Sequence, residues 1–151
     1  MNELDKIDIQ LLKALQENAR TSIKELASQV YLSSPATASR ISRMEKMGYI
    51  KGYTVIEGES ELGYPIKAII NIQTDRKGRE SLFSFIYRCP NVTECAFVSG
   101  IYSIVISVFF ENTQKLDKFI NEIQKREADT MTQIVLSTPI LHRGIGGIME
   151  D

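Results

Sequence analysis

Within the first 50 residues, apolar side chains recur every three or four positions, which is the period of an amphipathic helix. The first run, which Asp5 is placed to cap, contains Leu4, Ile7, Ile9, Leu11, Leu12 and Leu15. A second run starts at Ser22 and Glu25, which form the Ser-x-x-Glu pattern of a capping box. Its apolar residues are Ile23, Leu26, Ala27 and Val30. The pattern therefore predicts two successive helices.

A third helix is predicted after the tight polar turn at Leu32-Ser33-Ser34-Pro35. Ser34 is the expected cap, and Pro35 suits the first helical position because its missing N–H would be unpaired there. Gly48 is placed to end this helix. Its buried stripe is expected to be narrow and to consist of Thr37, Ile41 and Met44.

The outer faces of this third helix carry small and basic side chains, namely Ala36, Ser39, Arg40, Ser42, Arg43 and Lys46. No acidic residue occurs between Glu25 and Glu45. A short scaffold helix followed by a helix with such a surface is the helix-turn-helix arrangement that fits the major groove of double-stranded DNA. The candidate DNA-binding residues are Ser33, Ser34, Pro35, Ala36, Ser39, Arg40, Arg43 and Lys46.

Arg40 and Arg43 lie one turn apart, where they could reach phosphates or guanine edges. Arg40 could instead brace the helix through an internal ion pair. Two amphipathic helices with a solvated basic face are also common in all-α proteins, so the motif alone leaves DNA binding open.

Residues 50–56 form a β-branched, strand-like run, and Gly58, Gly63 and Pro65 punctuate the connection that follows. Beyond it the apolar period alternates between that of strands and that of helices. Strands are predicted at 66–74, 92–99, 102–110 and 131–138, and helices at 77–88 and 113–126. The order βαββαβ is that of a ferredoxin-like sandwich, in which two helices cover one face of an antiparallel sheet.

The chain is therefore expected to be an α+β protein of two domains. The predicted parts are a helix-turn-helix, winged-helix-like DNA-binding domain at 1–52, a linker strand and hinge at 53–65, and a ferredoxin-like ligand-binding and oligomerisation domain at 66–151. The run from Ile104 to Phe110 has apolar residues on both sides of its strand. We expect the uncovered sheet face to be buried against a second copy of the chain, giving a dimer and then a tetramer or octamer.

Charge supports DNA binding only in its distribution. The 151 residues have a formal net charge of −1, but residues 1–52 hold eight basic and six acidic side chains. A monomer with so few basic contacts would bind DNA weakly at physiological salt, which again favours an assembly. No apolar run approaches the roughly 18–20 residues of a membrane span, and the first residues are no signal peptide. We expect a cytoplasmic protein without membrane contact.

Residues for catalysis or metal binding are sparse. The single histidine, His142, has no neighbouring motif, and Cys89 and Cys95 match neither a zinc spacing nor a disulfide framework. Neither catalytic residues nor a metal or cofactor are expected, and an enzyme is disfavoured. The glycine-rich run at 144–147 lacks the strand-to-helix context of a nucleotide loop, so a flexible terminus is predicted there.

Several motifs taken together resemble the leucine-responsive regulatory protein/AsnC family, the feast/famine transcription regulators. They are Leu4-Asp5-x-x-Asp8, Asn18-Ala19-Arg20, Glu25-Leu26-Ala27, Leu32-Ser33, Arg40-Ile41-x-Arg43-Met44-Glu45, Gly48-Tyr49-Ile50-x-Gly52-Tyr53, Leu62-Gly63 and Val98-Ser99-Gly100. The resemblance implies an N-terminal DNA reader, a C-terminal domain for dimerisation and higher assembly, and often an amino-acid effector bound between dimers.

The loop that would hold the effector departs from the family pattern. The family usually has Gly-Asp-Tyr-Asp, and its last Asp commonly meets the ligand's ammonium, whereas this chain has Gly100-Ile101-Tyr102-Ser103. A hydroxyl lacks the charge of that partner, and charge-assisted hydrogen bonds are roughly twice as strong as neutral ones. The predicted effector residues are Ser99, Gly100, Ile101, Tyr102, Ser103, Thr132 and Ile134.

Three functions remain open from the sequence. The first is a ligand-responsive transcription regulator, and the second is an architectural DNA-binding protein that takes no effector. The third, a small-molecule-binding module without DNA binding, is disfavoured by the basic face that carries Arg40 and Arg43.

Overall fold

The chain forms two compact units in the computed structural model, which describes residues 4–142 and 144. Of the described residues, 4–56, 140–142 and 144 belong to the first unit and 57–139 to the second. Of the glycine-rich run predicted as a flexible terminus, residues 145–147 lie outside the described residues. Among the described helices, none has the length and apolar character needed to cross a bilayer.

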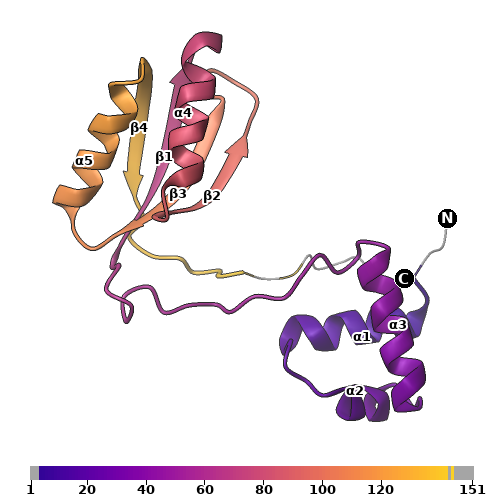
Figure 1. Cartoon of the computed structure of the whole chain (residues 1–151). Helices are drawn as coiled ribbons and strands as arrows, with labels where there is room; N and C mark the ends of the chain where they lie inside the picture. Colours follow the sequence, from indigo (N-terminus) through magenta and orange to yellow (C-terminus); the bar gives the residue numbers. More distant parts are fainter. Residues whose placement is uncertain (1–3, 143, 145–151) are drawn as a thin grey trace. The chain divides into compact units, whose positions relative to one another are not determined.

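Three helices make up the first unit (Figure 1): α1 (Lys6–Glu17), α2 (Ile23–Gln29) and α3 (Ser34–Lys46). Asp5 caps α1 by accepting the backbone N–H groups of Ile7 and Asp8, and the Asp8 carboxylate accepts the N–H of Asp5 in return. Ser22 and Glu25 form the equivalent capping box on α2. Both predicted caps are confirmed.

The cap of α3 lies one residue earlier than predicted. Ser33 has an extended backbone and its Oγ accepts the N–H of Ala36 at 3.3 Å, whereas Ser34 is already helical. Pro35 therefore occupies the second helical position, where an N–H would be unpaired just as at the first. The predicted end is confirmed, because Gly48 follows the last turn with φ +79°.

The core of the first unit is formed by one stripe from each helix. Its fully or nearly buried side chains are Leu11, Leu26, Val30, Ile41 and Met44. Thr37 is also fully buried, and its hydroxyl donates to the carbonyl of Ser33 at 3.1 Å, so its polar group is satisfied. The predicted stripe of α3 is confirmed.

The strand predicted at 50–56 is wrong for the single chain. These residues belong to no helix or strand, and no described strand pairs with them. Tyr53 donates its hydroxyl to Glu45 at 2.9 Å, and partial burial, followed by this hydrogen bond and then the Glu45 charge, raises the pKa of Tyr53. A strand needs a neighbour to accept its hydrogen bonds, and a β-branched pattern in one segment does not show whether that neighbour exists.

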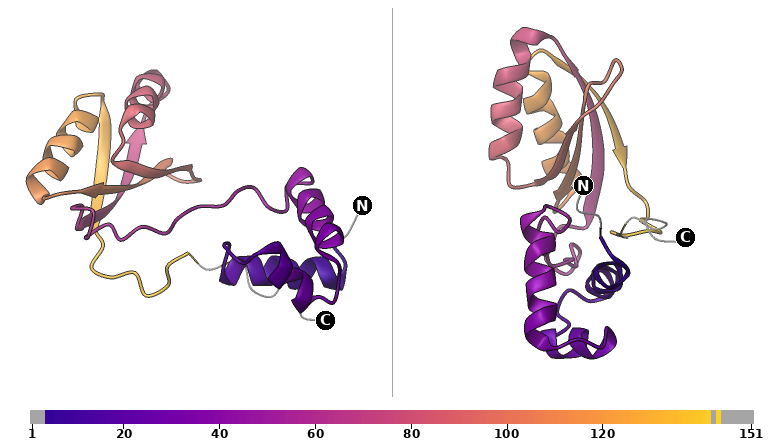
Figure 2. Two further views of the ribbon diagram at one scale, coloured as in Figure 1. Left: turned by 60° about the horizontal axis from the view of Figure 1, so that its bottom comes forward. Right: turned by 90° about the vertical axis from the view of Figure 1, so that its right-hand side faces the viewer.

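The second unit is a four-stranded antiparallel sheet with two helices on one face (Figures 1 and 2). The strands have the order β2-β3-β1-β4. In chain order the elements are β1 (Ile66–Thr74), α4 (Arg76–Arg88), β2 (Val92–Phe97), β3 (Ile104–Phe110), α5 (Thr113–Gln124) and β4 (Ala128–Ile134). This is the predicted ferredoxin-like βαββαβ arrangement.

The predicted bounds of three strands need correction. The last strand begins at Ala128, three residues before the predicted start, because Ala128 is opposite Thr74, the last residue of β1. It ends at Ile134 rather than 138, because Ile134 is opposite Ala68, close to the first residue of the antiparallel β1. The strands predicted at 92–99 and 102–110 are shorter because the N–H of Val98 bonds the carbonyl of Ser103 at 2.9 Å and closes a loop.

The two faces of the sheet differ in what covers them. The helix-covered face holds the core, which includes Ala68, Ile70, Ile72, Ile104, Ile106, Val108, Leu116, Phe119 and Ile123. On the uncovered face, which the right-hand view of Figure 2 shows opposite the helices, the alternation places Ile69, Val105, Phe109 and Met131 among polar neighbours. We call these four residues the open-face apolar group; three are half-buried and Met131 is exposed.

Candidate nucleic-acid interface

The exposed side of α3 is built from short side chains at its start and a lysine at its end. We call it the α3 outer face, and it consists of Ser34, Pro35, Ala38, Ser39, Ser42 and Lys46. These positions are exposed except Ser42, which is half-buried. The predicted contact residue Ser33 is exposed at the N-cap, and Ala36 is half-buried.

Ala38 belongs to this face although the sequence interpretation left it out. It lies one turn after Ser34 and one turn before Ser42, so helical spacing alone could have found it.

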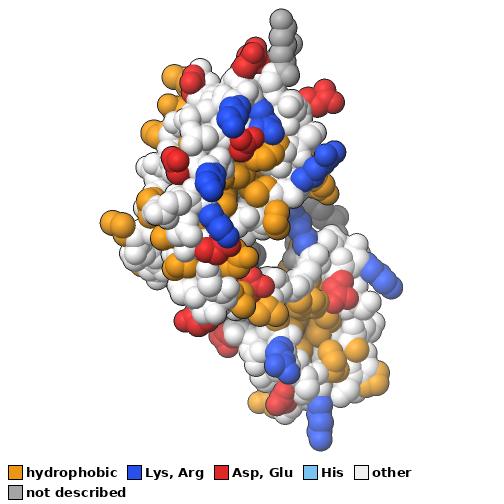
Figure 3. Space-filling view, turned by 60° about the vertical axis from the view of Figure 1, so that its left-hand side comes forward, with side chains coloured by type: hydrophobic (Ala, Val, Ile, Leu, Met, Phe, Trp, Pro, Cys, Tyr) orange, Lys and Arg blue, Asp and Glu red, His pale blue; other side chains and the backbone are white. Residues whose placement is uncertain are grey.

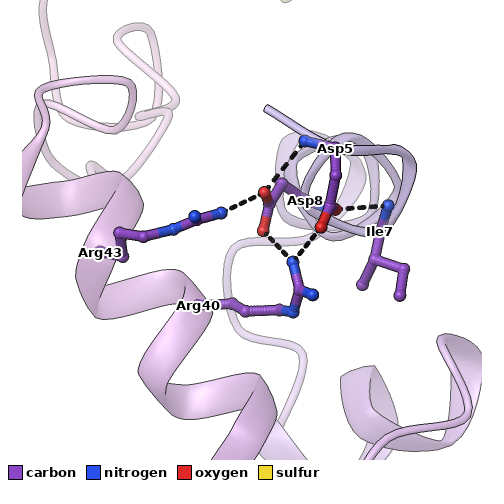
Figure 4. Close-up of polar contacts among 5 residues, drawn as sticks. All are labelled: Asp5, Ile7, Asp8, Arg40 and Arg43. Atoms are coloured by element: carbon purple, nitrogen blue, oxygen red, sulfur yellow. Dashed lines mark hydrogen bonds and ion pairs between the residues drawn. The ribbon is translucent and has the colours of Figure 1, made fainter. Parts of the chain in front are cut away.

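Arg40 and Arg43 point from α3 toward the start of α1 and meet two carboxylates there (Figure 4). The Arg40 Nη1 lies 2.6 Å from Asp5 Oδ2 and 2.8 Å from Asp8 Oδ1, and Arg43 donates to the other oxygen of Asp8. Asp8 is fully buried, whereas the Arg40 and Arg43 side chains remain 28% and 42% exposed. We call these four residues the Asp–Arg cluster.

Within the Asp–Arg cluster, the surroundings of Asp5 and Arg40 favour the charged forms of these two side chains. The N–H of Asp8, and after it the Arg40 guanidinium, hold the pKa of Asp5 below its ordinary value. The hydrogen bonds to Asp5 and Asp8 raise the pKa of Arg40. The cluster therefore fixes α3 against α1, and the internal ion pair considered for Arg40 also involves Arg43. Contact of either arginine with DNA stays a prediction.

The turns on both sides of α3 have the same backbone arrangement. Between α2 and α3, Tyr31 has φ +54° and is 95% exposed. After α3, Gly48 takes the equivalent left-handed position. The sequence interpretation did not single out Tyr31, because no local pattern shows that a tyrosine adopts a positive φ.

The loop predicted to hold an effector joins β2 to β3. Gly100 has φ +114°, a conformation that favours glycine, and Ile101 is 74% exposed, while Tyr102 and Ser103 are half-buried. Thr132 and Ile134 lie on β4, which β1 separates from β3. Within one chain the structure does not bring the predicted effector residues together into one pocket.

A different hollow lies between α4 and β2. It has a volume of about 430 Å³, and its lining includes Phe83, Tyr87, Cys95 and Phe97. Partial burial raises the pKa of the Cys95 thiol. None of the predicted effector residues lines this hollow.

The comparisons with known proteins match both units. Residues 4–51 match the family model described as winged helix-turn-helix DNA-binding, and residues 67–145 match the Lrp/AsnC ligand binding domain. The transcriptional regulator LrpC of Bacillus subtilis is 28% identical over 89% of this chain and 93% of its own length. LrpA of the same organism is 32% identical over 81% of this chain and 90% of its own length.

Solved structures show the same fold. The structure of B. subtilis LrpC superposes with a TM-score of 0.84 at 28% identity, covering 90% of this chain and 96% of that one. The feast or famine regulatory protein Rv3291c from M. tuberculosis, complexed with L-methionine, superposes with a TM-score of 0.87 at 26% identity. That match covers 95% of this chain and 99% of that one.

A helix-turn-helix unit followed by a ferredoxin-like ligand-binding unit defines a class of transcription regulators. The chain belongs to the Lrp/AsnC family, and it is a helix-turn-helix transcriptional regulator of that family.

Proposed function

We propose that the α3 outer face enters the major groove of double-stranded DNA and supplies the sequence-specific contacts of this regulator. The observation that carries the proposal is the composition of that face, which combines small and hydroxyl side chains with Lys46 in the last turn. The single acidic residue of α3, Glu45, accepts the Tyr53 hydroxyl. Short side chains let a helix approach base edges closely, and a lysine can neutralise a phosphate.

Assembly is the second part of the proposal. The face shown in Figure 3 carries basic and acidic side chains mixed among hydrophobic ones on both units. Residues 1–52 hold only eight basic side chains against six acidic ones, so electrostatic attraction from one chain is modest. Paired recognition helices in a dimer or larger oligomer would add the missing affinity. The open-face apolar group supports a sheet-to-sheet dimer, with tetramers or octamers built from it.

The first test removes one charge and adds another on α3. Lys46→Ala should weaken binding to specific and random duplexes alike, and the slope of log affinity against log salt should fall by about one per protomer. Ser39→Glu should reduce affinity by roughly 100-fold or more, because it places a carboxylate against phosphates or base acceptors. Fluorescence anisotropy at several salt concentrations measures both effects.

Lys118→Ala is the matched control, since Lys118 is exposed on α5 of the other unit. It should leave both affinity and salt slope unchanged. If Ser39→Glu bound DNA as tightly as the unmodified chain, the α3 outer face could not be the DNA-binding surface.

A small-molecule effector is the third part of the proposal. The M. tuberculosis relative whose structure is described as a complex with L-methionine supports an amino-acid-like ligand for this chain. The hydroxyl of Ser103, in the loop between β2 and β3, would nevertheless give an amino-acid ammonium a neutral partner. This residue favours a second candidate function, a regulator of the same build that works without an effector.

We expect native binding of common amino acids to be weak, and Ser103→Asp to tighten it. A poorly matched ammonium costs on the order of 1–3 kcal/mol, which is roughly a ten- to hundred-fold loss of affinity. Calorimetry with the standard amino acids measures both proteins. Ser84→Asp, which adds the same charge at an exposed position of α4, should change nothing. Low-micromolar binding of an ordinary amino acid by the unmodified chain would contradict the expectation.

A further inference from the structure

Tyr31 occupies a backbone position that usually belongs to glycine. It is the residue after the C-cap of α2, with φ +54°. The N–H of Leu32 bonds the carbonyl of Ala27 at 3.0 Å, and the N–H of Tyr31 approaches the carbonyl of Ser28 at 3.4 Å. These two bonds define a Schellman turn, whose left-handed residue is glycine in most helices because a Cβ is disfavoured there.

The turn at the other end of α3 has the same geometry without backbone strain. There Gly48 takes the left-handed position, its N–H bonds the carbonyl of Glu45 at 3.0 Å, and the N–H of Tyr49 bonds that of Met44 at 3.0 Å. The two turns thus have equivalent bonding, but one carries glycine and the other tyrosine. Tyr31 lowers the stability of its turn relative to glycine.

The Tyr31 side chain makes no contact with the described residues that would offset this cost. It is 95% exposed, and within residues 4–142 and 144 the structure gives it neither a hydrogen bond nor a ring contact. A large aromatic residue on strained backbone, without a packing partner among the described residues, indicates a role in contact with another molecule.

The position of Tyr31 specifies that molecule. It lies two residues before Ser33, the N-cap of α3, and at this end of the helix Ser33 and Ser34 are exposed and no acidic residue occupies the first turn. A helix N-terminus favours anions, and tyrosine hydroxyls are regular donors to DNA phosphates. We propose that Tyr31 donates its hydroxyl to a backbone phosphate beside the major groove that α3 enters. This inference rests on the proposed DNA binding and names a positioning contact within it.

The test compares Tyr31→Phe and Tyr31→Gly with the unmodified full chain. The probes are a duplex selected from a random pool by the unmodified protein and a random-sequence duplex of equal length. Tyr31→Phe keeps the backbone and ring, so its expected loss of affinity, about 5–20-fold on both duplexes, reports the hydroxyl alone. Tyr31→Gly should lose at least as much affinity while its melting temperature rises by roughly 2–5 °C.

Glu127→Gly is the matched control, because Glu127 is also an exposed residue at positive φ, +55°, but lies in the second unit. It should raise the melting temperature similarly and leave DNA affinity unchanged. Unchanged affinity in Tyr31→Phe, or a loss restricted to the selected duplex, would overturn the phosphate contact while DNA binding itself stood. Failure of the unmodified protein to bind either duplex would overturn the proposed function instead.

Discussion

Replacing Asp8 by alanine is expected to lower the free energy of unfolding of the helical unit by about 2–4 kcal/mol. Asp8 is fully buried and accepts hydrogen bonds from Arg40, Arg43 and the N–H of Asp5. Its removal leaves two guanidinium groups without their buried partner and breaks the capping box of α1. The arginines are partly exposed and can hydrate, which keeps the expected cost below the upper end known for buried pairs. Urea unfolding followed by circular dichroism measures the change.

Two further variants separate the cluster from general effects of losing a carboxylate. Asp5→Ala removes the α1 cap and the exposed partner of Arg40, so it should lower the free energy of unfolding by only about 1 kcal/mol. Asp129→Asn, at an exposed position of β4, should change stability by less than about 0.5 kcal/mol. If Asp8→Ala unfolded at the same urea concentration as the unmodified chain, the Asp–Arg cluster would not fix α3 on α1.

The Asp–Arg cluster is a feature that the sequence pattern alone could not predict. Helical spacing correctly identified Thr37, Ile41 and Met44 as the buried stripe of α3, because periodicity reports burial directly. The same spacing could not show that Arg40 and Arg43 face Asp8, which lies more than 30 positions earlier in the chain. Ion pairs across helices depend on packing that a one-dimensional pattern does not contain.

Elsewhere too, features that depend on neighbours in the sequence could be predicted, whereas features that depend on tertiary pairing could not. The capping residues Asp5 and Ser22 were predictable because their partners lie three residues away. The bounds of β4 were not, because the pairing with β1 determines where that strand begins and ends. Likewise, the β-branched run at 50–56 contains no information on whether a partner strand exists.

Val105→Asp is expected to convert the assembled protein into a monomer. Val105 lies on the uncovered sheet face, directly opposite Asn71 on β1 and Ala96 on β2, and belongs to the open-face apolar group. An aspartate there would be buried without a partner in a sheet-to-sheet dimer, at a cost on the order of 3–5 kcal/mol. That cost corresponds to a dissociation constant raised roughly a hundred- to several-thousand-fold. Light scattering at micromolar concentration measures the change in mass.

DNA binding should fall together with assembly, because a two-fold dimer presents paired recognition helices about 34 Å apart, one turn of the duplex. The monomer keeps α3 and should retain only weak, salt-sensitive affinity. Gln114→Asp, which adds the same charge at an exposed position of α5 on the helix-covered side, should leave both mass and affinity unchanged. A Val105→Asp protein with the mass of the unmodified assembly would show that the chain associates through a surface other than the open sheet face.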